Sequence, residues 1–357
     1  MDTKKIASAF HLESPILSID ECLLGHINST FFIHCLNARY VVQKINTVAF
    51  KKPDEIMSNI VRVTDHIREK LRAEGGDTLN GALKYFKSED RYFYVDDEGN
   101  YWRVCNHIDG DCHDSCDDPK IFENAGAAFG KFLLQLVDFD ASSLYEPIPD
   151  FHNTVKRYEM LEAAIERDVC GRATECAEEI AFIRARRDAC SFITDGIENG
   201  IFPLRVTHSD PKLNNLIMNK ETGEGICVID LDTVMPGAIL YDFGDAIRFG
   251  ASSAAEDEED LDKVYIRTDM FEAYTKGFVG ILRDSITEQE LRALPESART
   301  LTLELAIRFL TDYLEGDIYF RTSSEKHNLV RARNQIKLLS DIEQKRDILQ
   351  AIMEKYL

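Results

Sequence analysis

Residues 207–215, which read T-H-S-D-P-K-L-N-N, constrain the fold and chemistry of this chain more than any other segment. A histidine, an aspartate two places later and an asparagine five places after that aspartate form the pattern H-x-D-x-x-x-x-N. In phosphoryl-transfer loops with this spacing, the aspartate accepts a hydroxyl proton and the asparagine holds Mg²⁺. The pattern therefore makes Asp210 a candidate base and Asn215 a candidate metal ligand.

A predicted hairpin follows this loop and supplies a second metal ligand. Two apolar runs, residues 216–218 and 226–229, are separated by a glycine-bearing segment, which is typical of a β-hairpin. Folding it back brings Asp230 beside Asn215, and one carboxylate with one amide carbonyl suits Mg²⁺, which prefers a few hard oxygen ligands plus substrate phosphates. If the strand continues, Asp232 points the same way as Asp230. Asp232 could then bind a second metal ion or a substrate hydroxyl, or simply be solvated.

Three further polar residues near the loop are expected to be structural. The string D-F-G that begins at Asp242 resembles a magnesium-binding motif, but it lies beyond the strand-like stretch that M-P-G ends. We assign Asp242 and Asp245 to anchoring the loop or capping the next helix, where short acidic residues are favoured. We expect His208 to brace the loop by packing and hydrogen bonding, because Asp210 already fills the position of the base.

The composition indicates a soluble globular protein that handles small molecules. A chain of 357 residues exceeds the usual single core, which predicts two lobes. No apolar run approaches membrane-spanning length and no signal-like segment follows the start, so we expect a cytoplasmic protein without a membrane partner. A net charge of -21 with no Lys/Arg run argues against nucleic acid as a partner.

The nine cysteines are expected to be reduced thiols, because no export signal places them in an oxidising compartment. The one segment that invites a zinc interpretation, residues 111–118, combines two cysteines, a histidine and several aspartates. It lacks the regular second ligand pair of a closed zinc site, so we expect a solvated acidic loop there.

The pattern of elements changes along the chain and predicts the fold class. The first hundred residues read as strands around one helix, and the chain from residue 119 onward is mainly helical, interrupted by the H-x-D loop and its hairpin. This order predicts an α+β, two-lobed protein-kinase-like fold, with a small sheet-rich N-terminal nucleotide-binding lobe (1–107) and a larger, mainly helical C-terminal catalytic lobe (108–357). The expected strands are 23–24, 30–34, 39–44, 92–95 and 101–104. The expected helical regions are 53–74, 122–136, 153–197 with two helices, 298–314 and 328–356.

The small lobe contains a loop suited to nucleotide phosphates. Gly25, Asn28 and Thr30 lie between two predicted strands, where backbone amides can face phosphate groups, although the segment is not G-x-G-x-x-G. A phosphate-pairing cation is expected on the third strand, and Lys44 is its candidate. Because side chains alternate along a strand, either Gln43 or Lys44 faces the nucleotide.

In these residues the chain resembles the aminoglycoside phosphotransferase and choline kinase superfamily, and within it the bacterial N-acetylhexosamine 1-kinases most closely. The resemblance runs over nearly the full length, and several blocks in one order are far more specific than any single motif. The blocks are G-H-I-N near residue 25, Y-V-V-Q-K-I-N near 40, L-R-V-T-H-S-D-P-K-L-N-N, V-I-D-L-D-T-V-M-P-G, Y-D-F-G-D-A-I-R-F-G-A and F-L-T-D-Y-L-E-G-D-I-Y-F.

The resemblance implies ATP as cosubstrate, Mg²⁺ as cofactor, and transfer of the γ-phosphate to the anomeric 1-hydroxyl of N-acetylglucosamine or N-acetylgalactosamine. Asp210 would take the hydroxyl proton, Asn215 and Asp230 would hold Mg²⁺, and Lys212 would add positive charge at the γ-phosphate. The C-terminal lobe would then also bind the sugar. The implied sugar contacts are His26, Asp210, Asp230, Arg308 and Tyr319.

Structural alternatives stand beside the sugar contacts. Arg308, Asp312 and Tyr319 share one face if their helix is unbroken, but Gly316 is placed to break it. Arg308 pairing with Asp312, and His26 serving only local hydrogen bonds, are the simpler interpretations.

Other functions also stand beside the sugar kinase. These are a kinase for an aminoglycoside, choline, homoserine or another sugar, and a kinase-like binding protein without turnover, which the retained loop residues argue against.

Overall fold

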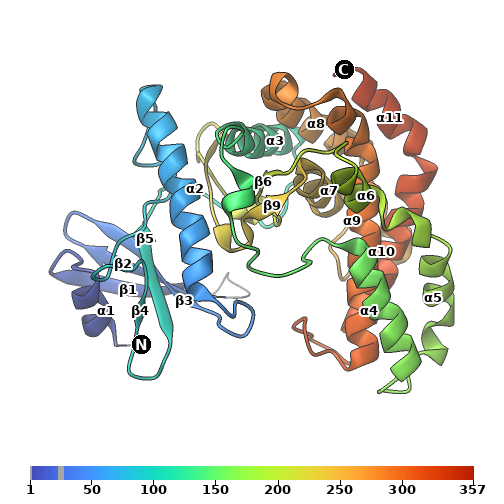
Figure 1. Cartoon of the computed structure of the whole chain (residues 1–357), viewed down its shortest axis with the longest axis horizontal. Helices are drawn as coiled ribbons and strands as arrows, with labels where there is room; N and C mark the ends of the chain where they lie inside the picture. Colours follow the sequence, from blue (N-terminus) through green and yellow to red (C-terminus); the bar gives the residue numbers. More distant parts are fainter. Residues whose placement is uncertain (1, 23–27) are drawn as a thin grey trace.

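The computed structural model describes residues 2–22 and 28–357, and this part of the chain forms a sheet-rich N-terminal lobe and a mainly helical C-terminal lobe (Figure 1). The predicted fold class is confirmed. The N-terminal lobe contains an antiparallel sheet in the order β1-β2-β3-β5-β4. Its strands are β1 (Ile16–Cys22), β2 (Ser29–Cys35), β3 (Arg39–Ile45), β4 (Tyr94–Val95) and β5 (Tyr101–Asn106).

The two faces of this sheet pack against different helices. Val42, Trp102 and Val104 join the short helix α1 (Thr3–Ala9) in one small core. Side chains of the opposite face, such as Ile45 and Cys105, join the main core with helix α2 (Pro53–Ala73). Helix α2 begins with proline at its first turn and buries its apolar side chains at helical spacing, as the sequence predicts. Helix α1 was not predicted.

The C-terminal lobe is built around the long helix α9, which contacts α4, α7, α10 and α11. Its first turn is closed by a capping box between Thr287 and Glu290. The helices of this lobe are α3 (Pro119–Leu134), α4 (Thr154–Arg167), α5 (Ala177–Arg184), α6 (Phe192–Glu198), α7 (Ile239–Gly250), α8 (Thr268–Leu282), α9 (Glu288–Glu315), α10 (His327–Gln344) and α11 (Arg346–Glu354).

Region 153–197 contains three α-helices where two were expected. Helix α4 ends at Arg167, the next residue Asp168 has a left-handed backbone (φ 37°), and Gly171 (φ 66°) turns the chain again before α5. Helices α5 and α6 are too short to show a clear period, which is why the sequence pattern merges them.

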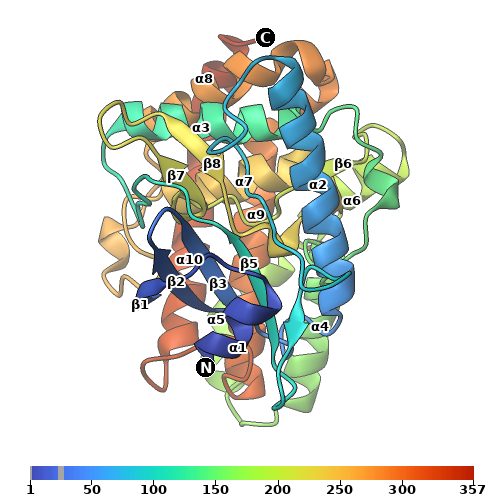
Figure 2. The ribbon, with the colours of Figure 1, turned by 90° about the vertical axis from the view of Figure 1, so that its left-hand side faces the viewer.

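Two small antiparallel pairs position the H-x-D loop inside the helical lobe. Strand β6 (Arg205–Thr207) pairs with β9 (Met235–Gly237), and β7 (Leu216–Met218) pairs with β8 (Gly225–Val228). Figure 2 shows the β7–β8 hairpin next to α3. The division at 107/108 falls in the connection between β5 and α3 and stays a prediction.

Among the described residues, no helix has both the length and the apolar character needed to cross a bilayer.

Candidate active site

The hairpin after the H-x-D loop forms as predicted and sets Asp230 next to Asn215. Leu216 pairs with Val228, and the backbone N–H of Ile229 donates to the carbonyl of Asn215 at 2.9 Å. Asp230, the residue after Ile229, therefore lies beside the end of the H-x-D loop.

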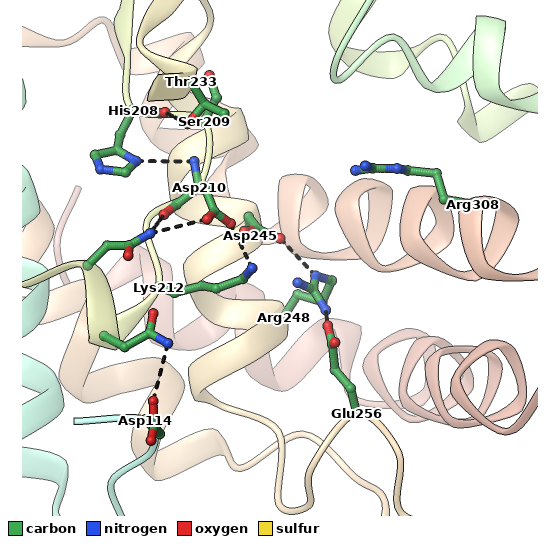
Figure 3. A network of polar contacts seen from close by, with 12 residues as sticks. Asp114, His208, Ser209, Asp210, Lys212, Thr233, Asp245, Arg248, Glu256 and Arg308 are labelled. Carbon is green, nitrogen blue, oxygen red and sulfur yellow. Dashed lines mark hydrogen bonds and ion pairs between the residues drawn. The ribbon is translucent and has the colours of Figure 1, made fainter. Parts of the chain in front are cut away.

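Asp210 is the centre of a polar cluster (Figure 3). The Asn215 side-chain amide donates to the Asp210 carbonyl at 2.8 Å and to its carboxylate Oδ2 at 3.1 Å. The Lys212 ammonium lies 2.9 Å from the other carboxylate oxygen, and both side chains are about one-third exposed (27% and 32%). Burial alone would raise the pKa of Asp210, but the ammonium of Lys212 outweighs burial and holds that pKa below its usual value. Asp210 is thus a solvent-reached carboxylate that stays ionised.

Asp230 has the properties of a metal ligand. Its backbone is left-handed (φ 58°), and solvent reaches the residue. Loss of hydration among the surrounding protein groups, together with the carboxylates of Asp232 and Asp210, raises its pKa to about 7. Within the described part of the chain, no hydrogen bond reaches its carboxylate, and Asn215 uses its NH₂ group on Asp210, which leaves its side-chain oxygen as an acceptor. These two oxygens fit Mg²⁺ that completes its shell with phosphates and water.

Asp242 anchors the loop, which is one of the two structural roles we predicted for it. From the first turn of α7, its carboxylate accepts the backbone N–H groups of His208 at 2.8 Å and Ser209 at 2.7 Å. Ser209 has a left-handed backbone (φ 67°), a conformation that persists at a non-glycine residue only when its surroundings impose it. Asp242 therefore fixes the residue directly before Asp210.

His208 braces the loop, as expected. Its Nδ1 accepts the backbone N–H of Asp210 at 3.2 Å, so Nε2 carries the ring proton and donates to the carbonyl of Ile229 at 2.8 Å. The rings of Phe129 and Phe132 meet the imidazole edge-on. The imidazole thus joins the H-x-D loop to the segment after β8 that leads to Asp230.

Asp245 belongs to a buried charge cluster behind Lys212. It lies 2.8 Å from the guanidinium of Arg248, which also pairs with Glu256 (Figure 3). The carboxylates of Asp245 and Glu256 join Asp210 in raising the pKa of Lys212 against the opposing effect of burial. Lys212 therefore stays charged beside Asp210.

Asp232 does not follow the strand alternation that we predicted. Strand β8 ends at Val228, and residues Leu231–Thr233 form a 3₁₀ turn, so Asp230 and Asp232 have different surroundings. Asp232 is buried and pairs with Arg103 of strand β5. A solvated side chain or a second metal ligand at this position is inconsistent with that pairing.

The register of the sheet decides between Gln43 and Lys44. Gln43 lies opposite Arg103 and donates to Thr30 of β2, whereas Lys44 lies opposite Trp102, whose side chain belongs to the core around α1. Gln43 therefore faces the α2 side, and Lys44 lies on the other face of the sheet. The structure places Lys44 away from the position that we predicted for the phosphate-pairing cation.

The loop predicted to cover phosphates is described in part. Gly25 and His26 lie outside the described residues. Asn28 donates to the Asp232 carboxylate at 2.6 Å and accepts the backbone N–H of Asn46 at 2.9 Å. In the acidic segment 111–118, as elsewhere in residues 2–22 and 28–357, no group of three or more His, Cys, Asp or Glu side chains is arranged to hold a metal ion.

Arg308 and Tyr319 come together although their helix is broken. Helix α9 ends at Glu315, and Gly316 (φ 98°) turns the chain back so that the Tyr319 ring lies 5.8 Å from the Arg308 guanidinium. The ion pair of Arg308 is with Glu304 at 3.6 Å and not with Asp312. Figure 3 shows the Arg308 side chain extending from α9 toward the side of Asp210.

Asp312 shapes the turn that carries Tyr319. Its carboxylate accepts the backbone N–H groups of Ile318 at 2.9 Å, Tyr319 at 2.7 Å and Phe320 at 2.9 Å. This residue positions the turn and is not a partner of Arg308.

His152 links the loop to the Arg308 side, and sequence reasoning missed it. Its Nε2–H donates to the carbonyl of Ser209 at 2.8 Å, and its Nδ1 lies 2.9 Å from the buried carboxylate of Glu304. Burial disfavours charge on the imidazole, but Glu304 outweighs it and raises the pKa of His152. The one signal in the sequence is a glutamate at a buried position of a helix, which needs a cationic partner.

Comparison with known proteins adds to this geometry. The model of the phosphotransferase enzyme family (APH) matches residues 19–274. An ethanolamine kinase of Plasmodium vivax superposes with a TM-score of 0.58 at 15% identity, covering 94% of this chain and 87% of that one. A choline kinase of Cryptosporidium parvum gives 0.57 at 13% identity, with 98% of each chain covered. The ADP-bound aminoglycoside phosphotransferase APH(2'')-Ib gives 0.52 at 14% identity over 96% of this chain and 99% of that one. At these identities the solved structures share the fold.

Proposed function

The chain belongs to the phosphotransferase enzyme family, and on that premise we propose that it transfers the γ-phosphate of ATP to the anomeric 1-hydroxyl of an N-acetylhexosamine. The family match supports a small-molecule phosphotransferase with an alcohol group as acceptor. The observation that carries the proposal is the ionised Asp210 carboxylate, which solvent reaches and which Lys212 and Asn215 hold in place.

Asp210 would act as the general base. Its lowered pKa keeps it ionised at neutral pH, so it can accept a hydrogen bond from the sugar 1-hydroxyl and take the proton as the oxygen attacks phosphorus. A weak base suits this reaction, because in a loose transition state the attacking oxygen keeps its proton until late. Asp210 therefore orients the hydroxyl from the start and takes its proton late in the step.

Asn215, Asp230 and Lys212 would bind the phosphates. The two oxygens of Asn215 and Asp230 would hold Mg²⁺, which when bound neutralises charge on the β- and γ-phosphates. Lys212 pairs with Asp210 and would also place positive charge near the γ-phosphate. Asn28 and Thr30 remain the proposed phosphate-loop residues of the small lobe, together with Gly25.

The Arg308 side supports a neutral acceptor. Burial lowers the pKa of Arg157, and the nearby guanidinium of Arg308 lowers it further. Arg308 is paired with Glu304 at 3.6 Å, so the two guanidinium groups and this carboxylate leave no excess of negative charge here to attract choline, ethanolamine or an aminoglycoside. The rings of Phe151 and Tyr319 lie 5.1 and 5.8 Å from Arg308, and aromatic faces with a few polar groups suit a sugar ring. We include Arg308, Tyr319 and His26 in the proposed sugar site.

The test is an ADP-release assay with N-acetylglucosamine, N-acetylgalactosamine, glucose, choline, ethanolamine and an aminoglycoside as acceptors. We expect turnover with the N-acetylhexosamines and a sugar 1-phosphate as the product, identified by phosphorus NMR. The methyl 1-glycoside of N-acetylglucosamine is the matched control, because it blocks only the reacting hydroxyl and should give no turnover.

Two outcomes would overturn this assignment. Turnover of a cationic alcohol without turnover of either N-acetylhexosamine would show that the acceptor is wrong. Equal ADP release with and without any acceptor would show that the protein hydrolyses ATP and does not transfer phosphate.

A further inference from the structure

Within residues 2–22 and 28–107, the small lobe shows no lysine–glutamate ion pair of the kind that a kinase-like nucleotide site is expected to contain. Gln43 occupies the α2-facing position of strand β3 where a cation is expected. Helix α2 buries only apolar side chains, Asn59 and Thr64, and its first-turn Glu55 pairs with Lys52 near the surface. Neither member of the usual pair is therefore present on these two elements.

A different ion pair lies next to Gln43. Arg103, the residue opposite Gln43 on strand β5, is 1% exposed, and both of its terminal nitrogens donate to the carboxylate of Asp232, one of them at 3.0 Å. Its Nε donates to the Gln43 side-chain oxygen at 3.0 Å. Arg103 belongs to the sheet and Asp232 to the helical lobe, so this pair joins the two lobes.

The Asp232 carboxylate also contacts Asn28, at the described end of the loop that we predicted to cover phosphates. Asn28 donates to Asp232 at 2.6 Å, and the Gln43 amide donates to the Thr30 hydroxyl at 3.1 Å. Asp232 thus receives hydrogen bonds from β5 and from the segment that leads into β2. It stands two residues after Asp230, the proposed Mg²⁺ ligand, within one 3₁₀ turn.

We propose that Arg103 is a positioning residue for the Mg²⁺-nucleotide, which through Asp232 holds the metal-binding turn and Asn28, directly before β2, in one fixed arrangement. The inference rests on the proposed function, because it presumes that Asp230 binds a nucleotide-bound metal ion.

Two physical arguments favour positioning over other roles. A buried ion pair adds little net stability compared with apolar side chains of similar size, because both charges lose their hydration. Direct phosphate binding is disfavoured as well, since Arg103 already directs its Nε and both terminal nitrogens to Gln43 and Asp232. Groups that orient a metal ligand from behind typically change metal affinity when they are removed.

The experiment measures nucleotide binding without any acceptor. Affinity for ATP is determined by titration calorimetry with and without Mg²⁺ for the wild-type protein, Arg103→Met and Asp232→Asn. We expect each variant to lose about 10- to 100-fold in affinity for Mg²⁺-ATP, with a much smaller change for metal-free ATP. Arg186→Met is the control, because Arg186, two residues after the end of α5, also makes a two-nitrogen pair, with Glu343 of α10, although this pair is less buried.

The double variant Arg103→Met/Asp232→Leu keeps the proposal testable if Arg103→Met fails to fold, because it removes both buried charges together. If the pair acts as a unit, the double variant loses no more Mg²⁺-dependent affinity than Asp232→Asn does. Unchanged affinity for Mg²⁺-ATP in folded variants would overturn the proposal, as would an equal loss in Arg186→Met. Wild-type protein that binds Mg²⁺-ATP but turns over no N-acetylhexosamine would instead contradict only the proposed acceptor.

Discussion

The hydrogen bonds from the loop before Asp210 to Asp242 determine how much stability and activity the substitution Asp242→Asn should remove. In Asp242→Asn, one side-chain oxygen still accepts a backbone N–H, but the new NH₂ group faces the other donor. The buried carboxylate now receives the N–H groups of His208 and Ser209 at 2.8 and 2.7 Å. Each hydrogen bond to a charged group contributes about 1.5–3 kcal/mol, and a neutral one about 0.5–1.5 kcal/mol.

The substitution therefore removes one hydrogen bond to a charged group and weakens the other, which becomes a hydrogen bond between neutral groups. Removing the buried charge offsets part of this loss, because burial raises the pKa of Asp242 and so opposes its ionisation. The net expectation is a decrease of about 2–3 kcal/mol in the free energy of unfolding. Ser209 also keeps its left-handed backbone at a cost of about 1–3 kcal/mol, so the loop is expected to relax at this point.

Relaxation of Ser209 shifts Asp210, and a misplacement of about 1 Å lowers kcat by about 100-fold. The assay combines urea unfolding with kcat at saturating substrates and Mg²⁺. Asp168→Asn is the control, because Asp168 also accepts a backbone N–H but lies at the end of α4. Wild-type kcat and stability in Asp242→Asn would refute this reasoning, and full recovery of kcat at high Mg²⁺ would indicate a metal ligand instead.

Three further predictions concern the proposed base, the proposed metal ligand and the turn assigned to the proposed acceptor site. Asp210→Asn should lower kcat by about 10²–10⁴-fold with little change in the KM for ATP, as measured from initial rates, because only proton acceptance is lost. Since the pKa of Asp230 is raised to about 7, its proton must leave before Mg²⁺ binds. The Mg²⁺ affinity in the presence of ADP should therefore fall about tenfold per pH unit below 7 and level off above it, and calorimetry showing a flat profile would contradict this assignment. Asp312→Ala releases the backbone N–H groups around Tyr319, so the KM for the acceptor should rise about tenfold while the KM for ATP stays constant, and equal changes in both would argue against an acceptor role for this turn.

Features encoded by nearby residues could be predicted from the sequence. The hairpin that brings Asp230 beside Asn215 depends on two apolar runs and one turn. The structural role of Asp242 followed from its distance along the chain and the M-P-G segment before it. Helix α2 followed from apolar spacing, because burial on one face of a long helix leaves a clear period.

The sequence could not show whether Gln43 or Lys44 faces the nucleotide. Side chains alternate between the two faces of a strand, and a shift of one residue in the pairing exchanges the faces. Gln43 and Lys44 are both half-buried, and only the pairing of Gln43 with Arg103 reveals which faces α2. Asp232 was misplaced for a related reason. The prediction assumes that side chains keep alternating after Val228. Strand β8 ends at Val228, and the left-handed backbone of Asp230 turns the chain out of the strand direction.

The remaining features that the sequence did not predict are contacts between residues far apart in the chain. His152 reaches Ser209 and Glu304, which belong to separate segments, and no local pattern marks such a partner. Helical spacing would put Tyr319 beside Arg308 only in an unbroken helix, and Gly316 was the residue expected to break it. The helix does end there, and the contact arises because Asp312 draws the chain back after the helix ends. The contact between Arg308 and Tyr319 therefore depends on three backbone hydrogen bonds to one carboxylate and not on the helical period.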